Sequence, residues 1–209
     1  MTLLPEDLLL LFVDEHTGQA LAGPETVTNA LSGGVLAELL QSGRLGYDSH
    51  AGQLRIIDPT PLAHPFLHES LTRLQAPLTP RRAVPRIRRF VRDNVLAGLE
   101  ARGVLTARKQ VFGGFVIQNA AAVSEVRAAT GSVLFGHRAQ DFRSGTLISL
   151  LHAVNAVHKV FGGARHELTA RAKQIAEAQS PAVTALHAAV FAEMVVAKVA
   201  ATSEGRLLR

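Results

Sequence analysis

Apolar residues recur at the three- and four-residue spacing of α-helices over most of this chain. From Pro85 onward, a helix with one apolar face is predicted by the residues Ile87, Phe90, Val91, Val95 and Leu99. The same spacing predicts further helices that end at Gly43 and Gly103, or that run over Thr146–Phe161, over Arg165–Gln179 and from Pro181 onward. A mostly helical core follows from this pattern.

Short alternating stretches follow two of these helices and predict two β-hairpins. The first pairs residues 44–47 with 53–57, and the second pairs 104–112 with 115–117 across Gly113 and Gly114. The helix ends before the hairpins also resemble each other, since residues 35–45 and 95–105 are identical at six of eleven positions. Two helix-then-hairpin modules are therefore expected, and a duplication is one explanation of their similarity.

A proline-rich connector separates the two modules. Six of the nine prolines lie in residues 59–85, around one predicted short helix near Phe66–Gln75. Apolar residues such as Leu67 and Leu71 predict that this segment wraps the core instead of linking two domains. We expect a mainly α, single globular domain over residues 1–209, with a helical-bundle core, amphipathic outer helices and two small β-hairpins.

Composition narrows the class of protein further. With 47% hydrophobic and 19% charged residues in 209 positions, the chain can bury one sizeable core. The absence of cysteine excludes disulfides, thiolate zinc sites and a cysteine nucleophile. No signal peptide or transmembrane segment is recognisable, because the stretch 8–13 is too short and 182–202 contains charged residues. A cytoplasmic protein with reversible membrane association is expected.

The positive charge of the chain is concentrated in one short run. The net charge is +5, and six arginines fall within twelve residues: Arg81, Arg82, Arg86, Arg88, Arg89 and Arg92. On the predicted helix, Arg88, Arg89 and Arg92 lie on the arc opposite the apolar face, and Arg86 extends it. Such a run attracts phosphates of lipid headgroups or nucleic acid, or an acidic protein, whereas a solvated helix face is the structural alternative.

Motifs for catalysis, metal binding and nucleotide binding are missing. The glycine pairs 33–34 and 162–163 lack the strand, lysine and helix of a phosphate-binding loop, and no G-x-S-x-G sequence is present. His64 and His68 have a metal-ligand spacing, but Pro65 lies between them and no third ligand is evident, so exposed loop histidines are favoured. We predict no catalytic residue, no metal, no cofactor and a non-enzymatic protein.

Four segments, in this order, resemble the Golgi phosphoprotein 3 family, also called the 34-kDa Golgi phosphoprotein domain. They are LLPEDLLLLFVDEHTG, ALSGGVLAELLQSGRL, RRFVRDNVLAGLEARGVLTARKQ and LLHAVNAVHKVFGG, and the resemblance runs from about Leu3 to the end of the chain. The chain resembles a short, prokaryotic-looking member without the basic N-terminal tail. A mostly helical domain with a projecting hairpin is implied.

The resemblance also implies a site and a ligand. Family members bind phosphatidylinositol 4-phosphate through a pocket of arginines and a tryptophan, and two of those arginines match Arg89 and Arg92. Gly23 and Ser32 stand where the family has the tryptophan and a further arginine. Arg89 and Arg92 are therefore the predicted headgroup contacts, and Arg81, Arg82, Arg86 and Arg88 form a supporting basic patch. The predicted partner is an anionic phospholipid surface.

The second hairpin is implied to serve membrane contact and self-association, through Phe112 and Phe115 beside the glycine turn. Packing of both phenylalanines on the body of the protein is the alternative. A different function, nucleic-acid binding by winged-helix-like modules, stays open but is disfavoured, because few base-reading side chains accompany the arginines. A scaffold that binds an acidic protein is a third interpretation.

Overall fold

Helices form most of the protein. The computed structural model describes residues 2–108 and 114–207, and the side chains in this part up to residue 197 together with that of Val199. The elements are α1 (Leu4–Leu11), α2 (Pro24–Gln41), β1 (Leu45–Asp48), β2 (Gln53–Ile56), α3 (Pro65–Leu74), α4 (Pro80–Ala101), β3 (Leu105–Ala107), β4 (Phe115–Ile117), α5 (Ala120–Leu134), α6 (Phe142–Ala153), α7 (Val157–Phe161), α8 (Arg165–Glu177) and α9 (Pro181–Leu207). The predicted mainly α class is confirmed.

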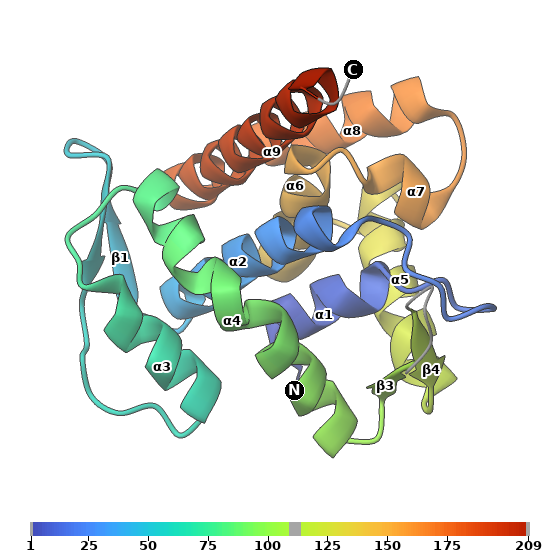
Figure 1. The fold of residues 1–209 in the computed structure, drawn as a ribbon, viewed down its shortest axis with the longest axis horizontal. Helices are drawn as coiled ribbons and strands as arrows, with labels where there is room; N and C mark the ends of the chain where they lie inside the picture. Colours follow the sequence, from blue (N-terminus) through green and yellow to red (C-terminus); the bar gives the residue numbers. More distant parts are fainter. Residues whose placement is uncertain (1, 109–113, 208–209) are drawn as a thin grey trace.

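Helices α1 and α2 lie in the middle of the molecule, and the other helices surround them (Figure 1). Helix α4 crosses in front of α2, α9 packs against both of these helices, and α5 and α6 cover other faces. The two hairpins are at opposite ends, with β1–β2 beside α3 and β3–β4 beside α5. Each is antiparallel, with Leu45 opposite Ile56 in the first and Leu105 opposite Ile117 in the second.

Every residue of α1 is buried, including two acidic ones in its first turn. The Glu6 carboxylate lies 2.7 Å from an Arg102 guanidinium nitrogen and accepts a hydrogen bond from the Leu3 N–H. Asp7 pairs with Arg143 of α6 at 2.6 Å. A buried charge is stable only when it is paired, and carboxylates also favour the positive end of a helix dipole. The two pairs therefore attach α1 to α4 and to α6.

Helix α4 starts five residues earlier than its sequence pattern predicts. Pro80 occupies the first turn after the N-cap Thr79, and Pro85, the predicted start, lies inside the helix. Proline lacks an N–H, so the Arg81 carbonyl loses its helical partner. Pro85 lies on the exposed side of the helix, where the missing bond is not buried in the core. The predicted apolar face is confirmed, because Ile87, Val91, Val95 and Leu99 are buried.

The predicted helix over Thr146–Phe161 is in fact two helices. Helix α6 ends after Ala153, and Asn155 has a left-handed φ of 55°. The Ala156 N–H then donates to the Leu151 carbonyl at 2.9 Å, a bond typical of a helix terminus. Asparagine adopts this conformation more readily than other non-glycine residues. The chain therefore turns here, and α7 runs in a new direction.

The Asp7–Arg143 pair generates a stability prediction. Asp7→Ala leaves Arg143, whose side chain is only 22% exposed, without its partner, and we expect a loss of about 3–5 kcal/mol in the free energy of unfolding. The matched control is Glu69→Ala, which breaks the exposed Arg73–Glu69 pair on α3 and costs about 1 kcal/mol or less. Chemical denaturation measures both. Equal losses would contradict a structural role for the buried pair.

A stacked histidine pair between α6 and α9 generates a pH prediction. The His152 Nδ1 and His187 Nε2 atoms lie 2.9 Å apart, so at least one ring must be neutral. Burial, followed by the neighbouring His152, lowers the pKa of His187 to about 4, and burial and Lys173 lower the pKa of His152. The unfolded chain therefore binds more protons between about pH 4 and 6.5, and stability falls as the pH drops through this window.

His187→Gln removes one of these titrating groups. We expect the stability lost between pH 7 and pH 5 to shrink by about 2 kcal/mol, as a pKa shift of this size implies. His166→Gln, at an exposed position of α8, is the control and should leave the pH dependence unchanged. Denaturation curves at several pH values measure both variants. An unchanged slope in His187→Gln would show that the pair does not couple folding to pH.

Candidate anion-binding site

A cavity of about 420 Å³ lies where several parts of the chain that are distant in sequence meet. The end of α1, the following loop, the start of α2, α4, the β3–β4 hairpin and α7 all contribute to its wall. The lining residues are Leu9, Phe12, Ala20, Leu21, Ala22, Gly23, Pro24, Val27, Arg92, Gly114, Phe115 and Lys159. Its wall is mostly apolar, and Arg92 and Lys159 supply its only charged side chains among the described residues. We call it the Arg92 cavity.

Arg92 reaches the cavity because α4 is anchored on both sides of it. Val91 and Val95 are buried in the core, so the half-buried Arg92 side chain emerges at the edge of the helix. Lys159 comes from α7, which turns toward the cavity after Asn155. Within the described residues, the side chains of Arg92 and Lys159 have neither a hydrogen bond nor an ion pair. Two cations without a counter-charge at one cavity favour an anionic ligand.

The N-terminus of α2 adds a further positive end. Gly23 is the N-cap of this 18-residue helix and makes no side-chain capping bond. The first N–H groups of a helix have no partner within it, and the helix dipole favours anions there. Glu25 in the first turn is paired with Arg88 of α4 at 2.6 Å, which offsets its negative charge. The cavity therefore combines two side-chain cations with a helix N-terminus.

The hairpin wall of the cavity is held by the loop after α1. The Phe115 N–H donates to the Gly18 carbonyl at 2.7 Å, and Arg108 donates to the Thr17 carbonyl at 3.0 Å. Gly18 has a φ of +70°, and a Cβ atom there would lie 2.2 Å from the Phe115 carbonyl oxygen. Only glycine fits this contact. It packs the turn end of the two strands, at Phe115, against the loop that forms the opposite wall.

The structure gives the six arginines of the run different environments. Arg86 donates to the Leu74 carbonyl at the end of α3, and Arg88 pairs with Glu25, so both contribute to the fold. Arg81 and Arg82 are exposed and, with Arg86 and Glu193, line a shallow hollow at the start of α4. Arg89 is exposed on α4 and lines no described cavity. Of the two predicted headgroup contacts, only Arg92 lies at the cavity.

The remaining positions named from the sequence are Gly23, Ser32, Phe112 and Phe115, and they do not all lie at the cavity. Gly23 lines the cavity, and a Cβ atom there would meet no atom within 4 Å, so a larger side chain has room. Ser32 is completely buried in α2 and donates to the Thr28 carbonyl at 2.8 Å, so it does not reach the cavity. Phe115 is 3% exposed and packs on the body of the protein. Phe112 lies outside the described residues.

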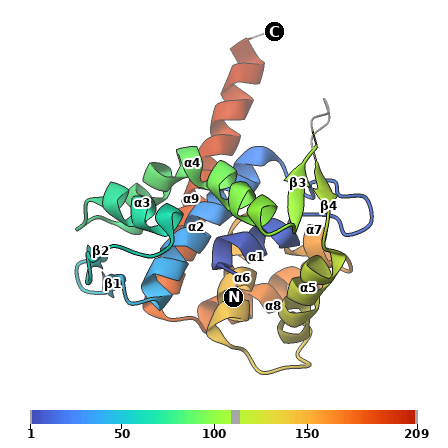
Figure 2. The ribbon, with the colours of Figure 1, turned by 90° about the horizontal axis from the view of Figure 1, so that it is seen from below.

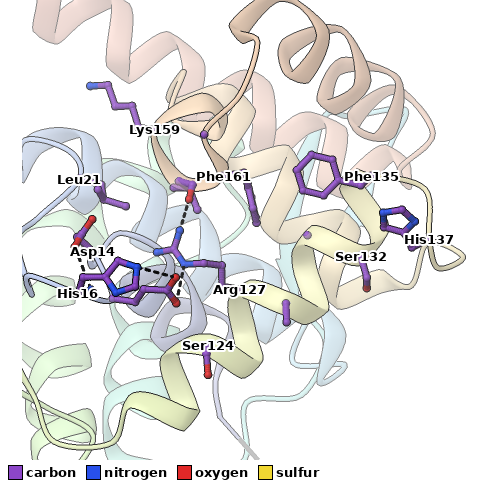
Figure 3. Close-up of a pocket in the computed structure, with 15 residues that line it drawn as sticks. Asp14, His16, Leu21, Ser124, Arg127, Ser132, Phe135, His137, Lys159 and Phe161 are labelled. Carbon is purple, nitrogen blue, oxygen red and sulfur yellow. Dashed lines mark hydrogen bonds and ion pairs between the residues drawn. The ribbon is translucent and has the colours of Figure 1, made fainter.

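A larger cavity of about 660 Å³ lies next to the first one, between α5, α7 and the loop after α1. Figure 3 shows Arg127 crossing it from α5 toward the Val160 carbonyl and the Glu15 carboxylate. Arg127 also donates to the Val13 carbonyl at 2.8 Å. Its guanidinium therefore connects three segments of the fold. Lys159 lines both cavities, and its side chain points away from Arg127 (Figure 3).

Two features of the site were absent from the sequence-based prediction: the Lys159 side chain and the free N–H groups at the start of α2, where only Gly23 was named, as the position of the family tryptophan. Lys159 stands in a pattern of valines that predicts an ordinary amphipathic helix. The Gly23-Pro24 pair is typical of a helix start, so the sequence indicates where the helix begins but not which distant residues lie beside that end.

Among the described residues, no group of three metal-ligating side chains exists. None of the described helices combines the length and hydrophobicity needed to cross a bilayer.

Comparison with known proteins identifies the family of this chain. A search of curated proteins finds none that is similar to this chain. The model of the Golgi phosphoprotein 3 (GPP34) family, in contrast, matches residues 4–193, which contain every residue of the Arg92 cavity. The match covers most of the 209 residues and includes all the elements from α1 to the first half of α9. The chain therefore belongs to the Golgi phosphoprotein 3 family.

Proposed function

We propose that this protein is a non-enzymatic, peripheral membrane protein that binds the phosphorylated headgroup of an anionic phospholipid in the Arg92 cavity. The observation that carries the proposal is the convergence of Arg92, Lys159 and the N-terminus of α2 on one cavity. A phosphate there accepts charge-assisted hydrogen bonds from both side chains and from free backbone N–H groups. Family membership supports a phosphoinositide such as phosphatidylinositol 4-phosphate as the ligand.

The exposed arginines then have a separate role. Arg81, Arg82 and Arg89 lie on α4 outside the cavity and, within the described residues, form no ion pair. Each basic residue near an anionic membrane contributes about 1 kcal/mol of attraction, without selecting a headgroup. These three residues attract the membrane surface, whereas Arg92 and Lys159 contact the headgroup. Salt weakens both contributions, so salt dependence alone does not separate lipid from nucleic acid.

Arg92→Ala tests the cavity. We expect at least about a tenfold loss of affinity for phosphatidylcholine liposomes that contain phosphatidylinositol 4-phosphate, because a charge-assisted hydrogen bond contributes about 1.5–3 kcal/mol. Arg55→Ala is the matched control, since it removes one exposed arginine from the β1–β2 hairpin. Liposome flotation measures both variants. Equal binding by Arg92→Ala and Arg55→Ala would contradict the proposal.

Two additional arms identify the ligand class. Soluble inositol phosphate should compete with the liposomes if the headgroup occupies the cavity, whereas inorganic phosphate should compete weakly because it lacks the ring. Duplex DNA is the third competitor. Strong competition by DNA that depends on Arg92 would favour the nucleic-acid interpretation over the lipid one.

Gly23→Trp tests the same cavity with a substitution that is expected to strengthen binding. The Cβ position is open and the φ of −64° suits any residue, so the indole can extend the apolar wall beside the headgroup. We expect about threefold tighter binding to the same liposomes, equivalent to about 0.7 kcal/mol. Calorimetry or flotation measures the affinity, and thermal unfolding checks that the variant folds. Weaker binding in a folded variant would show that the headgroup does not lie beside Gly23.

A further inference from the structure

Helix α9 exposes apolar side chains where it leaves the body of the protein. Phe191 is 54% exposed, Val195 45% and Val196 53%. Figure 2 shows the C-terminal half of α9 extending beyond the other helices. Residues 191 and 195 are neighbours one turn apart on the helix, and residue 196 lies about 100° further round, so the three share one broad arc. We call these three residues the α9 strip.

The first half of α9 fixes the direction of the strip. Val183, Leu186 and Val190 are buried against the core. One turn further, the Asn29 side chain donates to the Met194 sulfur at 3.5 Å, which continues the same packed face. Because this face is held by α2, the α9 strip points away from the body. Side chains of this size are seldom left exposed side by side without a partner surface.

The basic start of α4 lies directly beside the strip. Glu193 is three positions before Val196, on the side of α9 away from Phe191 and Val195, and it lines the same shallow hollow as Arg81, Arg82 and Arg86. Arg81 and Arg82 are exposed, and within the described residues their side chains have neither a hydrogen bond nor an ion pair. The surface is therefore apolar on one side and strongly positive on the other, with a single acidic residue between.

The combination of apolar and positively charged side chains distinguishes between two possible occupants of this surface, a second copy of the chain and an anionic lipid surface. A symmetric contact with a second copy of the chain would bring two arginine clusters close together, and like charges at an interface cost free energy. An anionic lipid surface satisfies both halves, because phosphates pair with the arginines while the apolar side chains enter the boundary between headgroups and acyl chains. The charge pattern thus favours lipid.

We infer that the α9 strip, together with Arg81 and Arg82, is a second membrane contact, distinct from the Arg92 cavity. Arg81 and Arg92 are separated by about 16 Å along α4, at 1.5 Å per residue. Figure 2 shows the C-terminal half of α9 and the strands β3 and β4 directed toward the same edge of the molecule, and Phe115 of β4 lines the Arg92 cavity, so we expect one membrane plane to reach both contacts. The inference rests on the proposed function and adds to it the orientation of the protein on the membrane.

The absence of tryptophan from the chain allows a direct test. Phe191→Trp places a single fluorescent reporter in the strip. With vesicles of phosphatidylcholine and phosphatidylserine, we expect its emission to shift to the blue and to be quenched by lipids brominated on the acyl chain. Ile57→Trp is the matched control, because Ile57 is 63% exposed beside the β1–β2 hairpin. Its emission should not change.

A second variant measures the contribution of the strip to binding. Val195→Ser combined with Val196→Ser should weaken vesicle binding about tenfold, because two apolar side chains no longer leave water. Ile57→Ser, which removes a comparable exposed side chain elsewhere, should bind like the parent. Circular dichroism checks that the variants are folded, which their exposed positions favour.

The outcomes separate this inference from the proposed function. If the parent protein binds vesicles in an Arg92-dependent way but Phe191→Trp neither shifts nor is quenched, the α9 strip is not a membrane contact and the cavity proposal stands. If the parent binds no anionic vesicle, both fail. A blue shift without lipid that grows with protein concentration, together with a dimer in sedimentation, would identify a second copy as the occupant and overturn the inference.

Discussion

The pairing of two buried acids with two arginines is the interaction on which the arrangement of this fold depends. Helix α1 is buried on every side, so its charged first turn can exist only with partners supplied by other helices. Arg102 at the end of α4 and Arg143 of α6 supply them. Arg127 of α5 completes the set by donating to the carbonyls at the end of α1. The loop after α1, which forms one wall of the Arg92 cavity, is positioned as a result.

Arginine has two different uses in this protein. Some arginines make bonds within the fold, either to carboxylates or to the carbonyl groups that helices leave without partners at their ends. Others lie on the surface of α4 or at the cavity, and within the described residues they lack such a partner. The run between Arg81 and Arg92 contains both kinds. A count of charges in the sequence therefore overstates the charge that a ligand meets.

Features that depend on residues close together in the sequence were predictable from the sequence. Both hairpins follow glycine-terminated helices, and the apolar face of α4 follows the spacing of its valines. The predicted start of α4 and the predicted single helix over residues 146–161 were wrong, because in each case the local sequence is compatible with two different helix boundaries. Pro80 and Pro85 both suit a first turn, and Val154 and Val157 continue a helical pattern across the turn at Asn155. Packing of the chain decides each case.

The candidate site was predictable only in part, for the same reason. Arg92 could be identified because it lies in a dense run of like charges and matches a family motif. Its partners in the cavity come from residues near 23 and 159, and no local pattern links these three regions. Arg89 lies three residues before Arg92, so its side chain is rotated by about 60° around the helix axis, and it is exposed outside the cavity. Only the folded structure selects between neighbours.

The turn at Asn155 has a thermodynamic consequence. It directs α7 so that Lys159 meets Arg92 and Gly23, which are 67 and 136 residues away along the chain. No shorter segment contains the complete cavity, so the unfolded chain has no equivalent binding site. Any ligand held there binds the native state alone and shifts the folding equilibrium by mass action. The position of one left-handed residue thereby couples occupancy of the cavity to the unfolding temperature of the whole domain.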